Sequence, residues 1–166
     1  MRRLTHDLRN TGRQGFTLVE LLVVIAVIIV VARFSYTTLV GDVGKQDLNA
    51  TTQKMAALAR EAQSLAMAQS SSTTWGVRFS NETSSAAYYA LFAGTYYPSS
   101  SVRGYYRLPA TVAYVSSSLT SGAVLDVYFS QITGRASPSA TIRIYSLRDT
   151  SRSSTISISP SGAVSF

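Results

Sequence analysis

The longest apolar run of the chain extends from Phe16 to Phe34 and is interrupted only by Thr17, Glu20 and Arg33. As an α-helix this run would rise about 28 Å, close to the thickness of a bilayer's hydrocarbon core. The run therefore predicts one helix long enough to cross a membrane. Arg33 would mark its outer boundary, because a long aliphatic stem lets the charge reach the headgroups.

A second, amphipathic helical pattern follows over residues 35–72. Gly41 and Gly44 each cost a helix about 1 kcal/mol relative to alanine, so the sequence leaves open whether the helix continues there or has a local break or a loosened turn. The three serines of residues 70–72 should end the helix, because serine competes for backbone hydrogen bonds. Spacings of three, four and seven residues place these residues on the buried face: Leu48, Met55, Leu58, Ala59, Ala62, Leu65, Ala66 and Gln69. The opposite, polar face carries Gln53, Lys54, Arg60, Glu61 and Ser64.

From Thr73 onward the hydrophobic period becomes two, which is typical of β-strands. Trp75, Val77 and Phe79 alternate with small or polar residues and predict a half-buried strand. Clusters of serine, glycine and proline separate the later apolar segments and favour an antiparallel sheet. The further expected strands are Ala87–Phe92, Arg103–Leu108, Thr111–Val115, Val124–Phe129, Ala140–Tyr145 and Thr155–Ser159.

Side-chain alternation also assigns faces to these strands. Ile142 and Ile144 should point into the core while Arg143 and Tyr145 point outward. Tyrosines occur as three adjacent doublets. Within the two strand-borne doublets, one ring should enter the core and the other should meet solvent or a partner. The doublets are Tyr88–Tyr89, Tyr96–Tyr97 and Tyr105–Tyr106.

Together these patterns predict an α+β protein. A long N-terminal α-helix, with a transmembrane half and an amphipathic half, packs on a C-terminal antiparallel β domain. The expected divisions are a leader at residues 1–15, a transmembrane segment at 16–34, an amphipathic continuation at 35–72 and a β domain at 73–166.

The charge distribution orients the chain. The net charge is +7, of which the leader supplies +3, from four arginines and one aspartate. Positive charge before a span favours a cytoplasmic N-terminus, so the β domain should lie outside the membrane. The chain has no cysteine, so neither disulfides nor thiolate metal sites hold the fold.

The junction between leader and apolar run, Arg13 to Glu20, reads RQGFTLVE. Gly15 has no side chain and lets the backbone lie open in a protease groove, so cleavage after it would free an amine on Phe16. Glu20 is the unusual residue, because a carboxylate costs about 2.5–3.5 kcal/mol at the centre of a membrane helix. The apolar residues that follow can offset this cost. Two alternatives are an ordinary secretory signal cleaved near Val30–Ala32 and an uncleaved anchor.

This junction resembles the class III signal of type IV pilins and of type II secretion pseudopilins. With one long helix and a cysteine-free β region, the chain is similar to the GspH/FimT family. The weaker C-terminal part of that resemblance lies in Tyr128–Gly134, Ile142–Ile144 and Ile156–Gly162. The resemblance implies a single-pass inner-membrane protein with a cytoplasmic N-terminus and a periplasmic C-terminal domain.

The resemblance also implies how the chain is processed and what it does. Prepilin peptidase would cleave between Gly15 and Phe16, and Phe16 would be N-methylated. Glu20 would contact the Phe16 amine of a neighbouring subunit. The implied function is that of a minor pseudopilin or minor pilin, assembled with other pilins into a periplasmic type II secretion pseudopilus that contributes to protein secretion. The alternative is a minor type IV pilin of the FimT/FimU kind, acting in pilus assembly or DNA uptake.

Two departures from the family pattern qualify this resemblance. Many members carry a proline near the outer end of the span, and residues 33–37 contain none. DNA-binding members tend to end in a Gly-Arg-x-Arg element, whereas Gly162 is followed here by Ala163, Val164 and Ser165.

Nucleic acid is a candidate partner on other grounds. Arg103, Tyr105 and Arg107 fall on one face of an expected strand, and Arg143 and Tyr145 share the outward face of another. Arginines interleaved with aromatic rings can hold phosphates and stack bases. Arg135, Arg148 and Arg152 would extend such a surface. A solvated strand face explains the same residues without a ligand, and is the favoured interpretation.

Catalysis finds no support in the sequence. The only histidine is His6, in the leader, so histidine acid–base or metal chemistry is excluded from a mature chain. The carboxylates are scattered and no Ser/His/Asp set can be assembled. We therefore expect no enzyme activity, no cofactor and no metal site.

Overall fold

The structure is a computed structural model that describes residues 16–97 and 102–166, with the side chains of residues 34–42 outside the description. The expected leader and Gly15 therefore lie outside the described residues. The chain divides into two compact units, which meet between Thr38 and Leu39. The fold is α+β, as the sequence predicts: a helix followed by antiparallel strands.

The helix, α1, spans Leu18–Met67 and continues through Gly41 and Gly44, where the sequence left a break open. Gly44 is buried, and the structure gives it a packing role. A Cβ built on it would lie 2.8 Å from Ser146 Oγ and 3.1 Å from Arg148 Cβ. The glycine lets α1 approach the end of a strand and the turn after it.

The helix ends earlier than the serine run. Gln69 adopts a left-handed conformation with φ 53°, and a short 3₁₀ turn, η1, follows at Ser70–Ser72. The amide of Gln69 bonds the carbonyl of Ala66 at 3.1 Å, which tightens the last turn. Gln69 is consequently exposed, and its assignment to the buried face is wrong.

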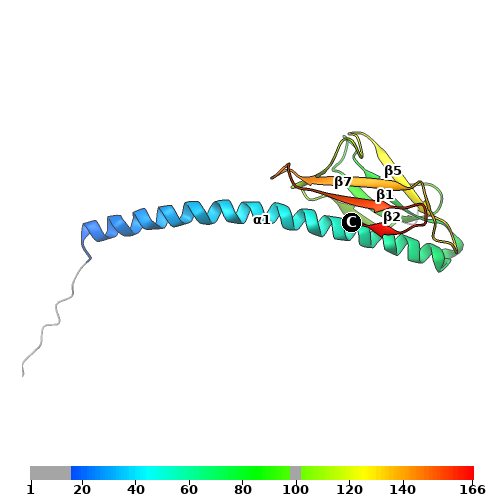
Figure 1. The fold of residues 1–166 in the computed structure, drawn as a ribbon, viewed down its shortest axis with the longest axis horizontal. Coiled ribbons are helices and arrows are strands. Elements are labelled where there is room, and N and C mark those ends of the chain that lie inside the picture. The colour runs from blue at the N-terminus through cyan, green and yellow to red at the C-terminus, as the bar shows by residue number, and fades with distance from the viewer. Residues whose placement is uncertain (1–15, 98–101) are drawn as a thin grey trace, which may run out of the picture. The chain divides into compact units, whose positions relative to one another are not determined.

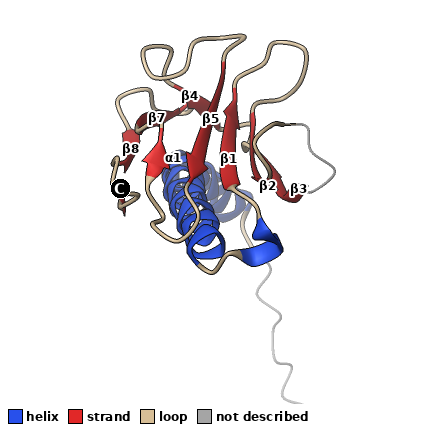
Figure 2. Cartoon of the chain, turned by 90° about the vertical axis from the view of Figure 1, so that its right-hand side faces the viewer, coloured by secondary structure: helices blue, strands red, loops and turns tan. Residues whose placement is uncertain are grey.

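The strands form two sheets in which every pairing is antiparallel. The five-stranded sheet has the order β3-β2-β1-β5-β6, and the four-stranded sheet has the order β4-β7-β8-β9. Figure 2 shows them as a curved layer against the helix. The bounds are β1 (Trp75–Ser80), β2 (Tyr88–Ala93), β3 (Val102–Arg107), β4 (Val112–Tyr114), β5 (Val124–Phe129), β6 (Ala136–Ser137), β7 (Ala140–Ser146), β8 (Ser153–Ile158) and β9 (Val164–Ser165).

The core lies between the strands and residues 48–66 of α1, along which the strands gather in Figure 1. Met55, Ala59 and Ala62 are completely buried there, so the predicted stripe is confirmed apart from its last residue. Ile142 and Ile144 are buried while Arg143 is exposed, which confirms the faces predicted for β7.

β1 is not the half-buried strand that its sequence suggested, because it is covered on both faces. Arg78 on its outer face forms an ion pair with Asp126 of β5 at 2.6 Å and lies 4.0 Å from the centre of the Tyr97 ring. Phe92 packs edge-on against the rings of Tyr97 and Tyr128. We call Arg78, Phe92, Tyr97, Asp126 and Tyr128 the outer aromatic cluster.

The tyrosine doublets also differ from expectation. Tyr88 and Tyr89 are both buried, whereas Tyr105 and Tyr106 are 45% and 46% exposed. The reason is pairing across strands: the Tyr105 ring lies 4.7 Å from that of Tyr88, and the Tyr106 ring 5.4 Å from that of Tyr89. The edge strand β3 thus covers both tyrosines of β2 and leaves its own rings half exposed.

Candidate functional site

The N-terminus of α1 is defined by Thr17, the residue directly before it. The backbone N–H of Glu20 donates to Thr17 Oγ1 at 3.2 Å, and the N–H of Leu21 donates to the Thr17 carbonyl at 3.2 Å. Thr17 is therefore the N-cap and Glu20 is the third helical residue, the spacing of a capping box. Carboxylates are favoured in the first helical turn, where free N–H groups carry partial positive charge.

The surroundings of Glu20 are apolar. It is the only charged residue between Phe16 and Ala32, and the large apolar side chains of this stretch are 45–80% exposed. Among the described residues no ion pair includes the Glu20 carboxylate.

Phe16, the predicted new N-terminus, is 80% exposed and stands one residue before the N-cap. Gly15, the other half of the predicted cleavage junction, lies outside the described residues. Within the part of the chain whose side chains are described, no helix combines the length and hydrophobicity that a membrane span requires.

The candidate nucleic-acid residues of β3 do not all share one face. A register shift in the pairing of β2 with β3 falls between Leu91 and Phe92, opposite Arg103. The Arg103 guanidinium lies 5.3 Å from the centre of the buried Trp75 ring, which belongs to the core. Tyr105 and Arg107 pair with Ala90 and Tyr88 and stay together on the outer face.

Arg143 and Tyr145 belong to β7, in the other sheet. Figure 2 shows β3 and β7 on opposite sides of the β domain. The structure therefore brings Tyr105 together with Arg107, and Arg143 together with Tyr145, but it does not join the two pairs into one surface.

The outer aromatic cluster was missed at the level of sequence. The hydrogen bonds that Arg78 donates to the Asp126 carboxylate raise the pKa of Arg78 above its usual value, although burial opposes this. Burial raises the pKa of Tyr97 to about 12. The members of the outer aromatic cluster come from β1, β2, β5 and the segment after β2, so no local sequence pattern reveals the cluster. The sequence analysis also missed the Thr17 cap, although a threonine three residues before a glutamate is a local signal for one.

The described residues contain no group of three or more histidine, cysteine, aspartate or glutamate side chains that would hold a metal ion. The site therefore consists of the capped acid, an exposed apolar helix and two separate pairs of arginine and tyrosine.

Comparison with known families points to the first of these features. Residues 10–32 match the family model described as the prokaryotic N-terminal methylation motif. The match includes Gly15, Phe16, the Thr17 cap, Glu20 and the start of the apolar helix. It supports a type IV pilin-like protein that is processed by prepilin peptidase, methylated and anchored at the inner membrane. No curated protein and no solved structure matches the chain.

Proposed function

We propose that the chain is a minor pseudopilin that assembles into a type II secretion pseudopilus and contributes to protein secretion. The observation that carries this proposal is the methylation motif at residues 10–32, with Glu20 on the third residue of an apolar helix. In this proposal, cleavage after Gly15 leaves an N-methylated Phe16 at the start of the mature chain. The role is structural, and no step of it requires a cofactor.

The position of Glu20 supports an assembly role. A free amine on Phe16 would place positive charge next to the positive end of the helix dipole, which is unfavourable. A carboxylate on the third helical residue compensates such a charge, either in the same chain or in a neighbour. In a filament, the Glu20 carboxylate would pair with the Phe16 amine of an adjacent subunit and fix the axial register between the two helices.

The exposed apolar residues supply the second part of the proposal. Side chains such as Ile25, Ile28 and Ile29 are 49–60% exposed in the isolated chain. Burial of apolar surface contributes about 25 cal/mol per Å², so this stretch would be stable only in lipid or among other helices. We propose that residues 16–34 form the membrane segment before assembly and the filament core after it, with residues 39–166 in the periplasm.

The alternative, a minor type IV pilin acting in pilus assembly or DNA uptake, shares all of these features except the β-domain surface. A nucleic-acid surface needs several cations along one track. The separation of β3 from β7 and the contact of Arg103 with Trp75 both speak against such a track.

A co-assembly experiment tests the proposal. The full-length chain is expressed with the pseudopilins of a type II system in one strain and with the minor pilins of a type IV system in another. Each membrane is then extracted in mild detergent. We expect the chain to co-purify with the pseudopilin set. Co-purification with the pilin set alone would select the alternative, and a processed chain that captures neither set would contradict both.

A further inference from the structure

A cavity of about 490 Å³ opens beside β7, within the volume range of small-ligand sites, roughly 300–1,000 Å³. Its walls come from the turn after β4, from β7, from the β7–β8 turn and from the first residue of β8. The residues that matter for binding are Ser116, Ser117, Arg143, Tyr145, Thr150 and Ser153. We infer that this cavity binds a sugar acid, meaning a hydroxyl-rich ring that carries one carboxylate.

The cation of the cavity is held in place. Both Nε and Nη2 of Arg143 donate to Ser153 Oγ, at 3.1 and 2.7 Å. Its backbone N–H donates to Ser118 Oγ at 3.1 Å, and its carbonyl accepts from the N–H of Val115 at 2.8 Å. Among the described residues Nη1 has no partner, so the end of the guanidinium fork is available. That edge matches the two oxygens of a carboxylate.

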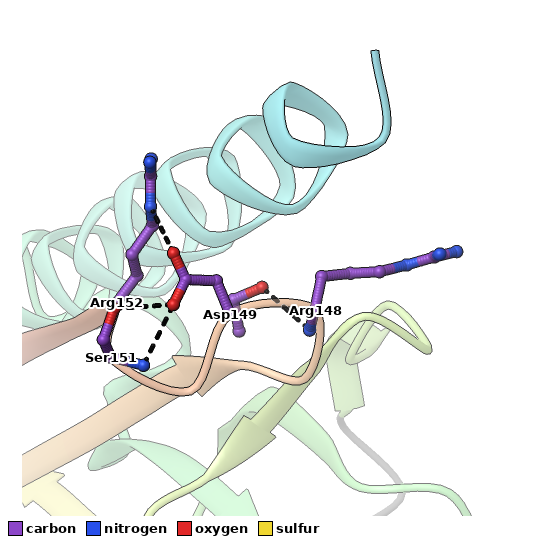
Figure 3. Close-up of polar contacts among 5 residues, drawn as sticks. Arg148, Asp149, Ser151 and Arg152 are labelled. Carbon is purple, nitrogen blue, oxygen red and sulfur yellow. Dashed lines mark hydrogen bonds and ion pairs between the residues drawn. The ribbon is translucent and has the colours of Figure 1, made fainter. Parts of the chain in front are cut away.

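No acidic side chain lines the cavity to cancel this charge. The nearest acid in the sequence, Asp149, accepts hydrogen bonds from the N–H and hydroxyl of Ser151 and from Nε of Arg152, as Figure 3 shows. These bonds, from Ser151 first and then Arg152, lower the pKa of Asp149. The acid is thereby tied to its own turn, which it shapes, and Arg143 remains the one charge of the cavity.

The other lining groups favour a sugar. Serine and threonine hydroxyls both donate and accept hydrogen bonds, so a wall of them matches a ligand with many hydroxyls. The half-buried ring of Tyr145 offers an apolar face for the C–H groups of a pyranose.

Phosphate and nucleic acid fit this cavity less well. A phosphate dianion calls for a second cation or a cluster of backbone N–H groups, and the lining provides a single guanidinium. Single-stranded nucleic acid calls for several stacking rings along a basic groove, and the lining has one ring.

The test uses full-length protein in detergent and two probes that differ only in one group, methyl glucuronide and methyl glucoside. Binding is followed by ligand-observed NMR at low salt. We expect the glucuronide to bind about tenfold more tightly than the glucoside, the value of one charge-assisted bidentate contact. Arg143→Gln should abolish this difference, and Ser153→Ala should reduce it. The control Arg148→Gln, which changes an exposed arginine outside the lining, should leave it intact.

Several results would overturn the inference. They are equal binding of the two sugars, displacement of the glucuronide by an equal concentration of inorganic phosphate, tighter binding of a single-stranded oligonucleotide, or no binding by any probe. Unchanged binding in Arg143→Gln would do the same. Thermal unfolding of each variant separates loss of a contact from loss of the fold.

Discussion

The hydrogen bond from the Glu20 N–H to Thr17 Oγ1 places the only acid of the apolar residues 16–34 on the first turn of α1. The same residue that the filament proposal assigns to a subunit contact is thus also part of the helix start. These two roles can be separated experimentally, because the cap uses the backbone of Glu20 and the contact uses its side chain.

Removal of the cap should loosen the helix start without abolishing assembly. Thr17→Val deletes the oxygen that accepts from Glu20, at a cost of about 1 kcal/mol. Hydrogen exchange in detergent should then be roughly fivefold faster at residues 20 and 21, whereas Thr17→Ser should behave like the wild type. Identical exchange in Thr17→Val would show that the cap contributes nothing to the helix start.

Removal of the Glu20 carboxylate should leave the capping hydrogen bond in place and impair assembly. Glu20→Val keeps the backbone hydrogen bond and removes the cost of an acid in lipid, about 2.5–3.5 kcal/mol at a span's centre and less near its end. We expect membrane insertion at least as efficient as in the wild type, and co-purification with partner pilins reduced at least tenfold. Glu20→Asp serves as the control that keeps the charge. Wild-type levels of partners on Glu20→Val would show that the contact is dispensable.

Gly162 should be intolerant of any side chain. It has φ +89°, and a Cβ there would collide with the carbonyl of Gly134 and with the Gln63 amide. Gly162→Ala should lower the free energy of unfolding by about 3 kcal/mol, from backbone strain and overpacking together. Gly122 has φ +84° with open space around it, so Gly122→Ala should cost only about 1 kcal/mol. Chemical denaturation measures both variants. Equal losses of unfolding free energy in Gly162→Ala and Gly122→Ala would contradict the packing role assigned to Gly162.

The fold should lose stability at high pH through its buried tyrosines. Burial, reinforced by Tyr106, raises the pKa of Tyr89 to about 12. Because the folded state favours the protonated form, this stabilisation is fully present below the unfolded pKa of about 10 and is lost as the pH rises toward 12. The melting temperature should therefore fall between pH 10 and 12. Tyr89→Phe should reduce this decrease in melting temperature. Tyr96→Phe should leave it unchanged, because Tyr96 is 72% exposed. A melting temperature that is constant up to pH 12 would contradict this prediction.

Much of the fold follows from local pattern, and the exceptions share one cause. The stripe of α1 and the faces of β7 were predictable because each depends on one element's own periodicity. The burial of Arg78 and Tyr88 was not, because Tyr97, Tyr105 and Asp126 cover them from other segments. The strands β6 and β9 have two residues each, too few to show alternation.

In the candidate site, too, some residues could be predicted from the local sequence and other groupings could not. Phe16 and Glu20 could be proposed from the sequence because the pattern that singles them out is contained in a few consecutive residues. The grouping of Arg103, Tyr105 and Arg107 on one face assumed a regular strand, and the register shift in the pairing of β2 with β3 breaks that assumption. The lining serines around Arg143 come from two stretches far apart in the sequence, residues 116–117 and 151–153, and only the fold brings them together.

The most direct test of the central claim is the intact mass of the chain extracted from membranes. The account predicts a mature protein that begins at Phe16, with residues 1–15 removed and one methyl group added. In Gly15→Val the branched side chain should crowd the cleavage site and leave the leader in place. An unprocessed wild-type chain, or a mature terminus at Arg33 as an ordinary secretory signal would give, would contradict the pilin-like assignment.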